Sequence, residues 1–347
     1  MGQGNRSILW HVQVLFISST GNSSDAPCHA CLATFALTLL ASIASVAAAQ
    51  SGEAAEHTVT VDGISRKYLV FAPKGFEKPL PVVLALHGGG SKARQMERYT
   101  RFNDLAAKEG FLVVYPEAVD GNWNDGRGIE GVRAQQENID DVKFVRLIVD
   151  RISKEYMIDR SRVFCTGISN GAFMSHRLAT EASDLIAAIA PVVGGMAPAM
   201  AKKYHPDQSV SILIIQGDAD PLVPIRGGMV GFPRGRKRGL VVPTEETISL
   251  YLRRNGNQGD PTVTTLDRDE KDGTSVEIRK YPDGPGGVKT QVYIVRNGGH
   301  TWAGRPLYLP EMLIGKASQE LSATEVIWEF FKSCPPRLAP PASKNPK

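Results

Sequence analysis

The sequence has few cysteines and little net charge. Its 347 residues include four cysteines, and the formal net charge is +4. Because this small surplus of positive charge is scattered along the chain, nucleic-acid binding is not expected. Apolar residues make up 42% of the chain and charged residues 22%, as expected of a soluble globular protein rather than a disordered or membrane protein. The length suits one large α/β domain or two small ones.

Basic residues are almost absent from the start of the chain, where Arg6 is the only lysine or arginine before Arg66. An apolar run over residues 32–46 leads into three alanines and a glutamine, which is the pattern of a secretory signal with an Ala-x-Ala cleavage site. The run is short for a membrane span and lacks a basic stop-transfer flank. We therefore expect residues 1–50 to be a signal segment. The mature protein would then be extracellular or periplasmic, without a stable membrane span. An uncleaved anchor or a misassigned start codon would also account for the missing basic residues.

The four cysteines give no sign of a zinc site. Cleavage near Ala49 would remove Cys28 and Cys31, whose C-x-x-C spacing has no second pair to complete such a site. Cys165 and Cys334 would remain, far apart in the sequence. We expect them to be two free thiols, although an exported chain could pair them.

From residue 57 onward, strand-like apolar runs alternate with helical segments. The strands are predicted at residues 58–61, 67–71, 82–86, 111–115, 162–166, 188–193, 211–216 and 291–295. The central runs are continuous in Val, Ile and Leu, as expected of parallel strands covered on both faces. Helices are predicted over residues 138–156 and 244–255, and after the capping box formed by Ser322 and Glu325. This alternation predicts a single α/β domain with a mainly parallel, doubly wound sheet. The Pro-rich residues 335–347 are expected to be a disordered tail, with no further module after it.

The most informative pattern is Gly-Ile-Ser-Asn-Gly at residues 167–171, which matches G-x-S-x-G between a predicted strand and a predicted helix. A sharp turn there pushes the hydroxyl of Ser169 out of the sheet, and the flanking glycines remove Cβ atoms that would clash. The turn also places the N–H of Asn170 at a helix N-terminus, where it can donate to an oxyanion. Ser169 is therefore predicted as a nucleophile. The motif alone would fit an ordinary serine in a glycine-rich turn equally well.

A serine nucleophile needs a base, and the base needs an orienting acid. After a turn of this kind the partners follow in the order Ser, Asp, His, each in a loop after a strand. His300, in Gly-Gly-His-Thr-Trp after the strand at 291–295, is predicted as the base. Two aspartates follow the strand at 211–216. We choose Asp220 as the acid because of its Asp-Pro turn, and we expect Asp218 to be a turn or capping residue.

The loop His-Gly-Gly-Gly at residues 87–90 follows the predicted strand at 82–86. Its glycines let the backbone approach a substrate, so the N–H of Gly89 is predicted as the second oxyanion donor beside that of Asn170. His87 is expected to brace the loop. A phosphate-binding role is excluded because the pattern G-x-x-x-x-G-K-[ST] is absent.

These motifs together resemble the polyhydroxybutyrate depolymerase-type esterases, a group of secreted α/β-hydrolases that includes feruloyl and acetylxylan esterases. The segments that carry the resemblance are residues 87–90, 115–117, 122–125, 167–171, 219–224 and 298–302. The resemblance implies an α/β-hydrolase catalytic domain over residues 57–334. It also implies hydrolysis of carboxylic esters through an acyl-serine intermediate, without a metal or cofactor. The sequence departs from the family at Asp218, where a small residue is common, and at Ala303, where a proline is common.

The substrate stays open at this point. Hydroxyalkanoate, hydroxycinnamoyl and acetyl esters, small or oligomeric, are all candidates. Trp123 and Trp302 are either walls of a substrate-binding acyl pocket or core residues, with nothing in the sequence to decide between the two.

One departure from the family is a basic loop at residues 227–242. It lies after the predicted acid and carries Arg234, Arg236, Lys237 and Arg238. The loop could bind an anionic substrate such as an acidic sugar ester, or it could be a solvated loop without a role.

Two further functions share this fold. A serine peptidase would use the same triad, but the chain has no propeller-like repeats or large cap to select peptides. A catalytically silent binding protein could also use the scaffold, and the complete set of Ser169, Asp220 and His300 argues against it.

Overall fold

The computed structural model describes residues 52–232 and 235–337. The predicted signal segment at residues 1–50, residues 338–347 of the predicted tail and Arg234 of the basic loop lie outside the described residues. The start of that tail is attached to the domain, because the N–H of Arg337 donates to the carbonyl oxygen of Ser161 at 2.7 Å. No helix within the described part of the chain is long and apolar enough to cross a membrane.

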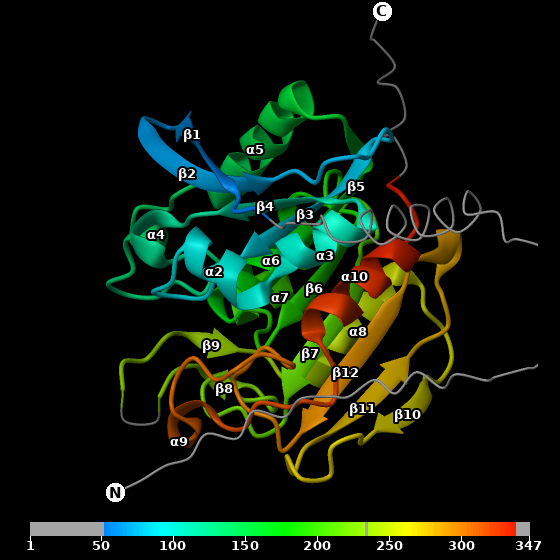
Figure 1. The fold of residues 1–347 in the computed structure, drawn as a ribbon. Coiled ribbons are helices and arrows are strands. Elements are labelled where there is room, and N and C mark those ends of the chain that lie inside the picture. Colours follow the sequence, from blue (N-terminus) through cyan, green and yellow to red (C-terminus); the bar gives the residue numbers. More distant parts are fainter. Residues whose placement is uncertain (1–51, 233–234, 338–347) are drawn as a thin grey trace, which may run out of the picture. The chain divides into compact units, whose positions relative to one another are not determined.

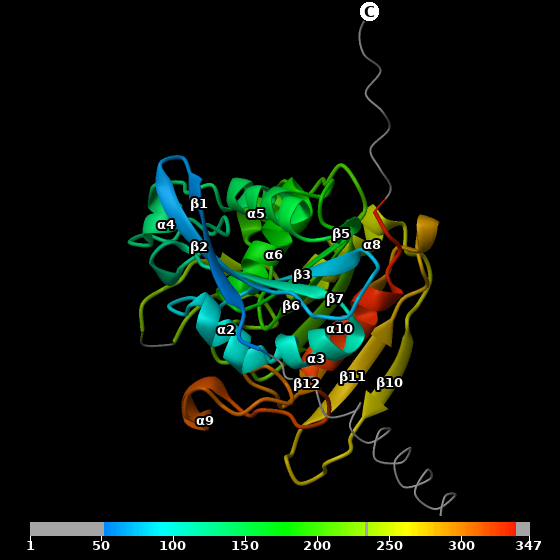
Figure 2. The ribbon, with the colours of Figure 1, turned by 45° about the horizontal axis from the view of Figure 1, so that its top comes forward.

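A ten-stranded mixed sheet forms the centre of the domain (Figure 1). Its strands are β1 (Ala55–Val61), β2 (Ile64–Phe71), β3 (Leu80–Leu86), β4 (Leu112–Pro116), β5 (Ile158–Ile168), β6 (Ala188–Val192), β7 (Ser211–Gly217), β10 (Thr262–Leu266), β11 (Ser275–Lys280) and β12 (Thr290–Arg296). In space they follow the order β1-β2-β4-β3-β5-β6-β7-β12-β11-β10. The strands from β4 to β12 in this order are parallel, and the pairs at the two edges are antiparallel (Figure 2). A separate pair, β8 (Gly228–Met229) and β9 (Leu240–Val241), lies in the basic loop.

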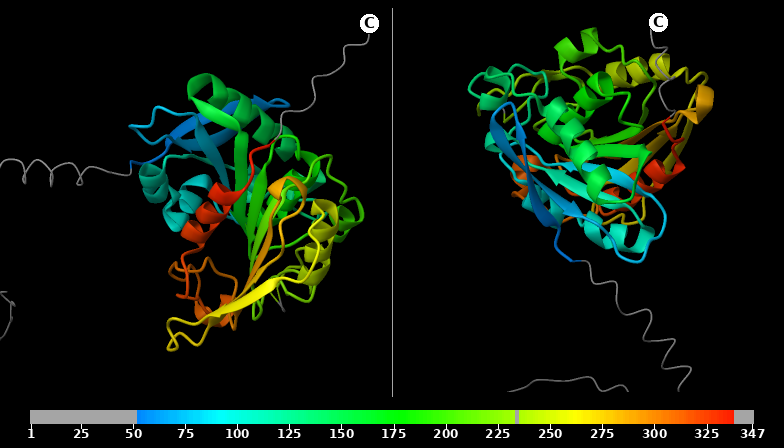
Figure 3. Two further views of the ribbon diagram at one scale, coloured as in Figure 1. Left: turned by 90° about the vertical axis from the view of Figure 1, so that its right-hand side faces the viewer. Right: turned by 90° about the horizontal axis from the view of Figure 1, so that it is seen from above.

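Helices cover both faces of the sheet (Figure 3). The helices are α2 (Ala93–Thr100), α3 (Phe102–Glu109), α4 (Arg133–Gln136), α5 (Asp141–Glu155), α6 (Asn170–Glu181), α7 (Pro198–Lys202), α8 (Thr244–Asn255), α9 (Glu311–Ile314) and α10 (Ala323–Ser333), with 3-10 turns at Val119–Gly121 and Pro285–Gly287. Side chains of α5, α6 and α8 form one core cluster with the sheet, and those of α2, α3 and α10 form the other. The predicted doubly wound α/β architecture is confirmed.

The continuous apolar runs arise because the central strands are buried on both faces. All seven residues of β3 are buried, and successive residues point to opposite faces. Leu84 belongs to the core on the α5 and α6 side, whereas Val83 and Ala85 belong to the core on the α2, α3 and α10 side. All eight predicted strands are present.

Helix α5 is shorter than the predicted segment at 138–156. Asn138 has φ of 47°, in the left-handed region, so the helix cannot extend back through it. Asp140 caps the helix instead, and its side chain accepts a hydrogen bond from the N–H of Lys143 at 2.8 Å. The predicted apolar face, represented by Val145 and Ile148, is fully buried.

The two cysteines of the described region are free and buried. Burial raises the pKa of the Cys165 thiol and that of the Cys334 thiol to about 12 each, so both are protonated and unreactive at neutral pH. Within the described residues, no group of three or more His, Cys, Asp or Glu side chains could hold a metal ion.

Candidate active site

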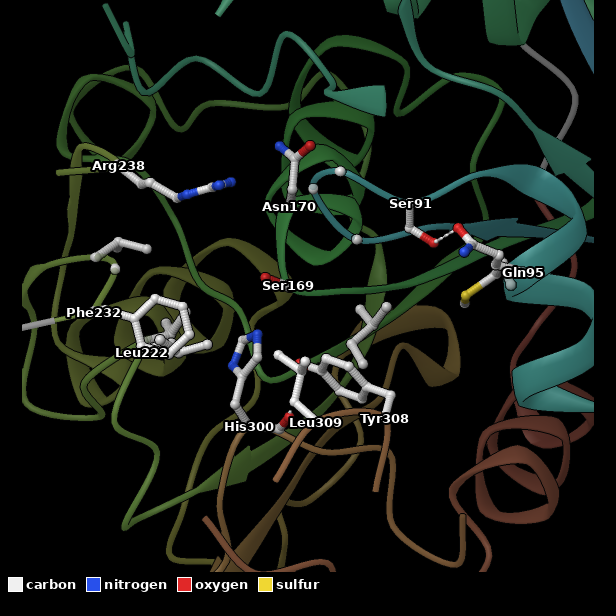
Figure 4. A pocket seen from close by; sticks show the side chains of 18 of the residues that line it. Ser91, Gln95, Ser169, Asn170, Leu222, Phe232, Arg238, His300, Tyr308 and Leu309 are labelled. Carbon is white, nitrogen blue, oxygen red and sulfur yellow. Dashed lines mark hydrogen bonds between the residues drawn. The ribbon is translucent and has the colours of Figure 1, made fainter. Parts of the chain in front are cut away.

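Four loops that carry the predicted site residues meet at one edge of the sheet. They follow β3, β5, β7 and β12, and parallel strands bring their carboxyl ends to the same edge. A pocket of about 510 Å³ opens there, and Gly89, Ser169, Asn170 and His300 line it (Figure 4). Asp220 is buried next to His300.

Ser169 lies at a strained turn between β5 and α6. Its backbone has φ of 55° and ψ of −118°, which residues other than glycine rarely adopt. The flanking glycines are required by close backbone contacts. A Cβ atom on Gly167 would lie 2.5 Å from the carbonyl carbon of Gly171, and one on Gly171 would lie 2.3 Å from the oxygen of Leu86. This packing lets the strand turn sharply into α6, with Ser169 at the pocket.

His300 and Asp220 form a buried hydrogen-bonded pair. His300 Nδ1 donates to Asp220 Oδ2 at 2.7 Å, and the two side chains are 3% and 0% exposed. The other carboxylate oxygen accepts from the N–H groups of Leu222 and Val223 at 2.8 and 2.9 Å. With Nδ1 donating to the carboxylate, Nε2 is the free nitrogen of the neutral ring.

Ser169 and the His300 ring face the same space. Figure 4 shows the imidazole pointing toward the serine hydroxyl in the middle of the pocket. Among the described residues, no side chain or backbone group forms a hydrogen bond with the Oγ of Ser169. The hydroxyl is therefore open to a molecule that enters the pocket.

Asp218, the alternative acid, is turned away from His300. Its carboxylate accepts from the N–H of Asn297 at 2.7 Å and from Arg296 Nη1 at 3.2 Å. These bonds tie the loop after β7 to the loop after β12. Asp218 therefore holds the turn that leads to His300, and its carboxylate is engaged outside the pocket.

The loop after β3 presents an unpaired backbone donor. The N–H of Gly90 donates to the oxygen of Gly121 at 2.8 Å, and the N–H of Ser91 donates to the oxygen of Gly88 at 3.2 Å. By contrast, the N–H of Gly89 and that of Asn170 have no acceptor within residues 52–232 and 235–337. Two free donors at the pocket are the arrangement that an oxyanion hole needs.

His87 braces this loop from beneath. Its Nε2 accepts a hydrogen bond from the N–H of Ala118 at 3.1 Å, so the ring proton is on Nδ1, which donates to the oxygen of Gly88 at 2.8 Å. Burial lowers the pKa of His87 to about 4, which keeps the ring neutral. Trp123 Nε1 donates to the oxygen of His87 at 2.9 Å.

A polar network that was not predicted from the sequence lies behind the serine turn. The side chain of Asn170 accepts from the N–H of Trp123 at 2.8 Å and donates to Asp125 Oδ2 at 2.5 Å. Asp125 also pairs with Arg127 at 2.6 Å and accepts from Gln135 at 2.9 Å. The Trp-Asn-Asp segment thus holds the first residue of α6, and the only sequence signal for it was the family resemblance.

Trp123 and Trp302 lie in the core. Each is 0% exposed, and neither lines the pocket. Trp302 packs edge-on against Phe102 with ring centroids 6.1 Å apart, and its Nε1 donates to Thr324 at 3.0 Å. Of the two alternatives left by the sequence, the core position is the one observed.

Residues of α2 and of several loops form the pocket wall instead. They include Met96, Tyr99, Leu222, Val230, Phe232, Arg238, Tyr308 and Leu309. Most of these residues come from irregular segments, where no hydrophobic period marks which side chains face inward. The sequence therefore offered no signal to select them.

Comparisons with known proteins give consistent results. Residues 66–208 match a family model described as "Esterase PHB depolymerase". The protein named "Putative esterase NocK" from Nocardia uniformis subsp. tsuyamanensis is 29% identical over 281 residues, covering 79% of this chain and 81% of that protein. Feruloyl esterase B from Piromyces equi is 27% identical over 243 residues, covering 68% of this chain but only 42% of that longer protein. The solved structure of acetyl xylan esterase from Aspergillus awamori shares the fold, with a TM-score of 0.54 at 16% identity, over 80% of this chain and 99% of that one.

Proposed function

Since the chain belongs to the polyhydroxybutyrate depolymerase-type esterases, we propose that it hydrolyses carboxylic esters with Ser169, His300 and Asp220 as a catalytic triad. The hydrogen bond of 2.7 Å between His300 and Asp220, beside Ser169 in one pocket, is the observation that carries the proposal. The buried carboxylate fixes the tautomer of the imidazole and stabilises the imidazolium, without taking the proton itself.

Acylation comes first. The Oγ of Ser169 attacks the ester carbonyl carbon while Nε2 of His300 accepts the hydroxyl proton. The carbonyl oxygen becomes an oxyanion, and the free N–H groups of Gly89 and Asn170 donate to it. When the intermediate collapses, the bond to the alcohol oxygen breaks and His300 gives its proton to that oxygen. The alcohol leaves, and Ser169 carries the acyl group.

Deacylation repeats these steps with water. His300 accepts a proton from a water molecule as the water oxygen attacks the acyl carbon. The same N–H donors stabilise the second oxyanion. Its collapse breaks the bond to the Oγ of Ser169, which recovers its proton from His300, and the carboxylic acid is released.

The pocket supports small or oligomeric esters with an apolar part. Its volume of about 510 Å³ is within the range of sites that enclose a small molecule. The sequence relatives named feruloyl esterase and acetylxylan esterase make hydroxycinnamoyl and acetyl esters the first substrates to consider, with hydroxyalkanoate esters next. Relative rates on methyl ferulate, acetylated xylan and hydroxybutyrate oligomers will separate these classes.

The test of the triad is the variant Ser169→Ala assayed with 4-nitrophenyl butyrate. We expect kcat to fall by about 10⁴-fold or more, because the nucleophile is removed while the pocket is kept. The matched control is Ser249→Ala. Ser249 lies on α8, and within the described residues its hydroxyl donates only to the carbonyl oxygen of Glu245, at 2.8 Å. Turnover that survives Ser169→Ala would overturn the proposal.

The same assay separates the two other functions. A serine peptidase of this fold would cleave 4-nitroanilide peptides as well as the ester, and a silent binding protein would turn over neither. We expect ester hydrolysis alone.

We also propose that the enzyme is exported. The apolar run that ends in three alanines supports this, and the mature chain is expected to begin after residue 49. Mass spectrometry of the N-terminus, on protein recovered outside the cytoplasm, tests the proposal. Protein found only inside the cell with Met1 retained would contradict it.

A further inference from the structure

Arg238 connects the basic loop to the pocket. Of the described basic side chains within residues 227–242, it alone lines the pocket, and Figure 4 shows its guanidinium reaching toward Asn170. A Cβ atom on Gly89 would lie 3.1 Å from Arg238 Nη1, so the charged group lies next to the proposed oxyanion donors. Backbone bonds hold this part of the loop, because the N–H of Arg238 donates to the oxygen of Val230 at 2.9 Å and its own oxygen accepts from Arg127 at 3.0 Å.

The guanidinium of Arg238 has no partner in the described part of the chain. It donates no hydrogen bond there and forms no ion pair with a carboxylate. The neighbouring cation Arg127 is different, because it pairs with Asp125 at 2.6 Å and lies over the ring of Phe173. Arg236 donates to the oxygen of Glu130 at 2.8 Å. Arg238 is therefore the pocket cation whose donors are available to a ligand.

The surroundings of Arg238 favour a bound anion. Partial burial, together with the positive charges of Arg127 and Arg236, lowers the pKa of Arg238, although a guanidinium stays charged at neutral pH. A carboxylate placed there would relieve the repulsion between these cations. It would also accept two parallel hydrogen bonds from the planar guanidinium.

The pocket has a charged side and a neutral side. In Figure 4, Arg238, Phe232 and Leu222 lie on one side of Ser169, and Gln95 and Tyr308 lie on the other. An ester extends in two directions from its carbonyl carbon, as an acyl part and an alcohol part. When the carbonyl carbon is at Ser169, one of these parts must occupy the side that carries Arg238.

We infer that the preferred substrates are esters that bear a carboxylate on the part occupying the Arg238 side of the pocket. This inference rests on the proposed ester hydrolysis at Ser169. Of the two alternatives for the basic loop, it selects the binding of an anionic substrate, and it assigns that binding to the side chain of Arg238. The carboxylate can belong to the acyl part or to the alcohol part, and two pairs of test substrates distinguish these sources.

The first pair is 4-nitrophenyl butyrate and the hemiglutarate ester of 4-nitrophenol, which carries a carboxylate at the end of its acyl chain. The second pair is methyl 4-acetoxybenzoate and 4-acetoxybenzoate, whose carboxylate is on the leaving group. We expect kcat/KM to favour the anionic member of one pair by about tenfold or more, the range for a charge-assisted hydrogen bond. Raising the salt concentration should weaken this preference.

The variant Arg238→Gln should lose the preference, because kcat/KM for the anionic ester should fall about tenfold more than kcat/KM for its neutral partner. Lys237→Gln is the matched control, because it removes the same charge from the adjacent exposed residue, which does not line the pocket. The control should keep the preference. Arg238→Lys should keep part of it, since the charge remains without the planar pair of donors.

Three results would overturn the inference. The wild type could favour the neutral member of both pairs, or show no preference in either. Arg238→Gln could lower kcat/KM equally for neutral and anionic esters, which would mean that Arg238 acts on the oxyanion common to all of them. Lys237→Gln could lose the preference as fully as Arg238→Gln. Failure of the wild type to hydrolyse any of the four esters would contradict the proposed function instead.

Discussion

Asn170 contributes its backbone to the pocket and its side chain to the structure behind it. The backbone N–H is free to donate to an oxyanion, while the side-chain amide accepts a hydrogen bond from the N–H of Trp123 and donates one to Asp125. Asp125 is in turn held by its buried ion pair with Arg127, in which the side chains are 0% and 4% exposed. These contacts orient the first residue of α6, and with it the N–H that we propose as an oxyanion donor.

The variant Asn170→Ala separates these two contributions, because alanine keeps the N–H and loses the anchor. We expect kcat on 4-nitrophenyl butyrate to fall by about tenfold with little change in KM, since a loosened donor weakens binding of the transition state more than that of the substrate. Steady-state kinetics and thermal unfolding together check this. Glu181→Gln, in the exposed last turn of α6, is the control. A lower melting temperature with unchanged kcat would show that the anchor is purely structural.

At the scale of residues, the sequence identified side chains that follow a strand and have a glycine or proline nearby. Ser169 and His300 each lie beside glycines after a strand, and Asp220 precedes a proline. Asp125 also precedes a glycine, but it does not directly follow a strand, and its contact with Asn170 joins residues 45 positions apart. The contact between Arg238 and the Gly89 loop likewise appears only when two distant loops are folded together.

The turn between β5 and α6 has a tight steric requirement. A Cβ atom on Gly171 would meet the carbonyl oxygens of Leu86 and His87 at 2.3 and 2.7 Å. Both oxygens belong to the backbone at the end of β3, which cannot move without disturbing the centre of the sheet. Glycine is therefore required for packing as well as for the turn.

We expect Gly171→Ala to destabilise the protein by several kcal/mol, beyond the usual cost of about 1–3 kcal/mol for an overpacked core position. The matched control is Gly88→Ala, because a Cβ atom there would find its nearest neighbours at 3.5 Å or more. Chemical denaturation of both variants measures the difference. Equal stability of the two variants would show that the backbone at this turn adjusts easily.

At the scale of elements, the buried strands and the edge formed by β1 and β2 were predictable from the sequence, whereas the opposite edge was not. Central strands such as β3 and β7 are mostly apolar and are buried along their whole length, because helices cover both of their faces. Strands β10 and β11 lie at an edge, and their sequences, Thr-Val-Thr-Thr-Leu and Ser-Val-Glu-Ile-Arg-Lys, mix polar and apolar residues. The pairing of β11 with β12 and of β10 with β11, rather than any apolar run, defines these two strands.

The stability of the whole molecule should depend on two histidines that are buried in the neutral form. Burial lowers the pKa of His87 to about 4 and that of His176 to about 3, both from 6.5. Between those values and pH 6.5 the unfolded chain binds more protons than the folded one, so stability falls as the pH is lowered. The full contribution is present above pH 6.5.

We expect the free energy of unfolding to decrease from pH 6.5 to pH 4 by about 3 kcal/mol for each of these histidines. His176→Phe should reduce this pH dependence, because it removes one of the two imidazoles that take up a proton on unfolding. A phenyl ring can replace the imidazole beside the ring of Tyr251, where Nε2 has no partner within the described residues. The exposed His205 provides the control variant, His205→Gln. Urea denaturation across this pH range checks the prediction. An unchanged slope in His176→Phe would contradict it.

At the scale of the whole molecule, the order of the motifs along the sequence predicted the common location of the loops. Loops after β3, β5, β7 and β12 must meet if these strands are parallel neighbours in one sheet, and they do. The shape of the pocket could not be predicted in the same way. Its walls come from loops whose paths depend on contacts such as the one between the Tyr308 hydroxyl and the oxygen of His300.

The central claim is that Ser169, activated by His300, is the nucleophile. A fluorophosphonate reacts covalently with an activated serine, and mass spectrometry of the digested adduct identifies the modified residue. We predict one adduct per chain, on the peptide that contains Ser169, and no adduct in His300→Ala under the same conditions. Inhibition with the adduct on another residue, or hydrolysis that continues after Ser169 is fully modified, would contradict the account.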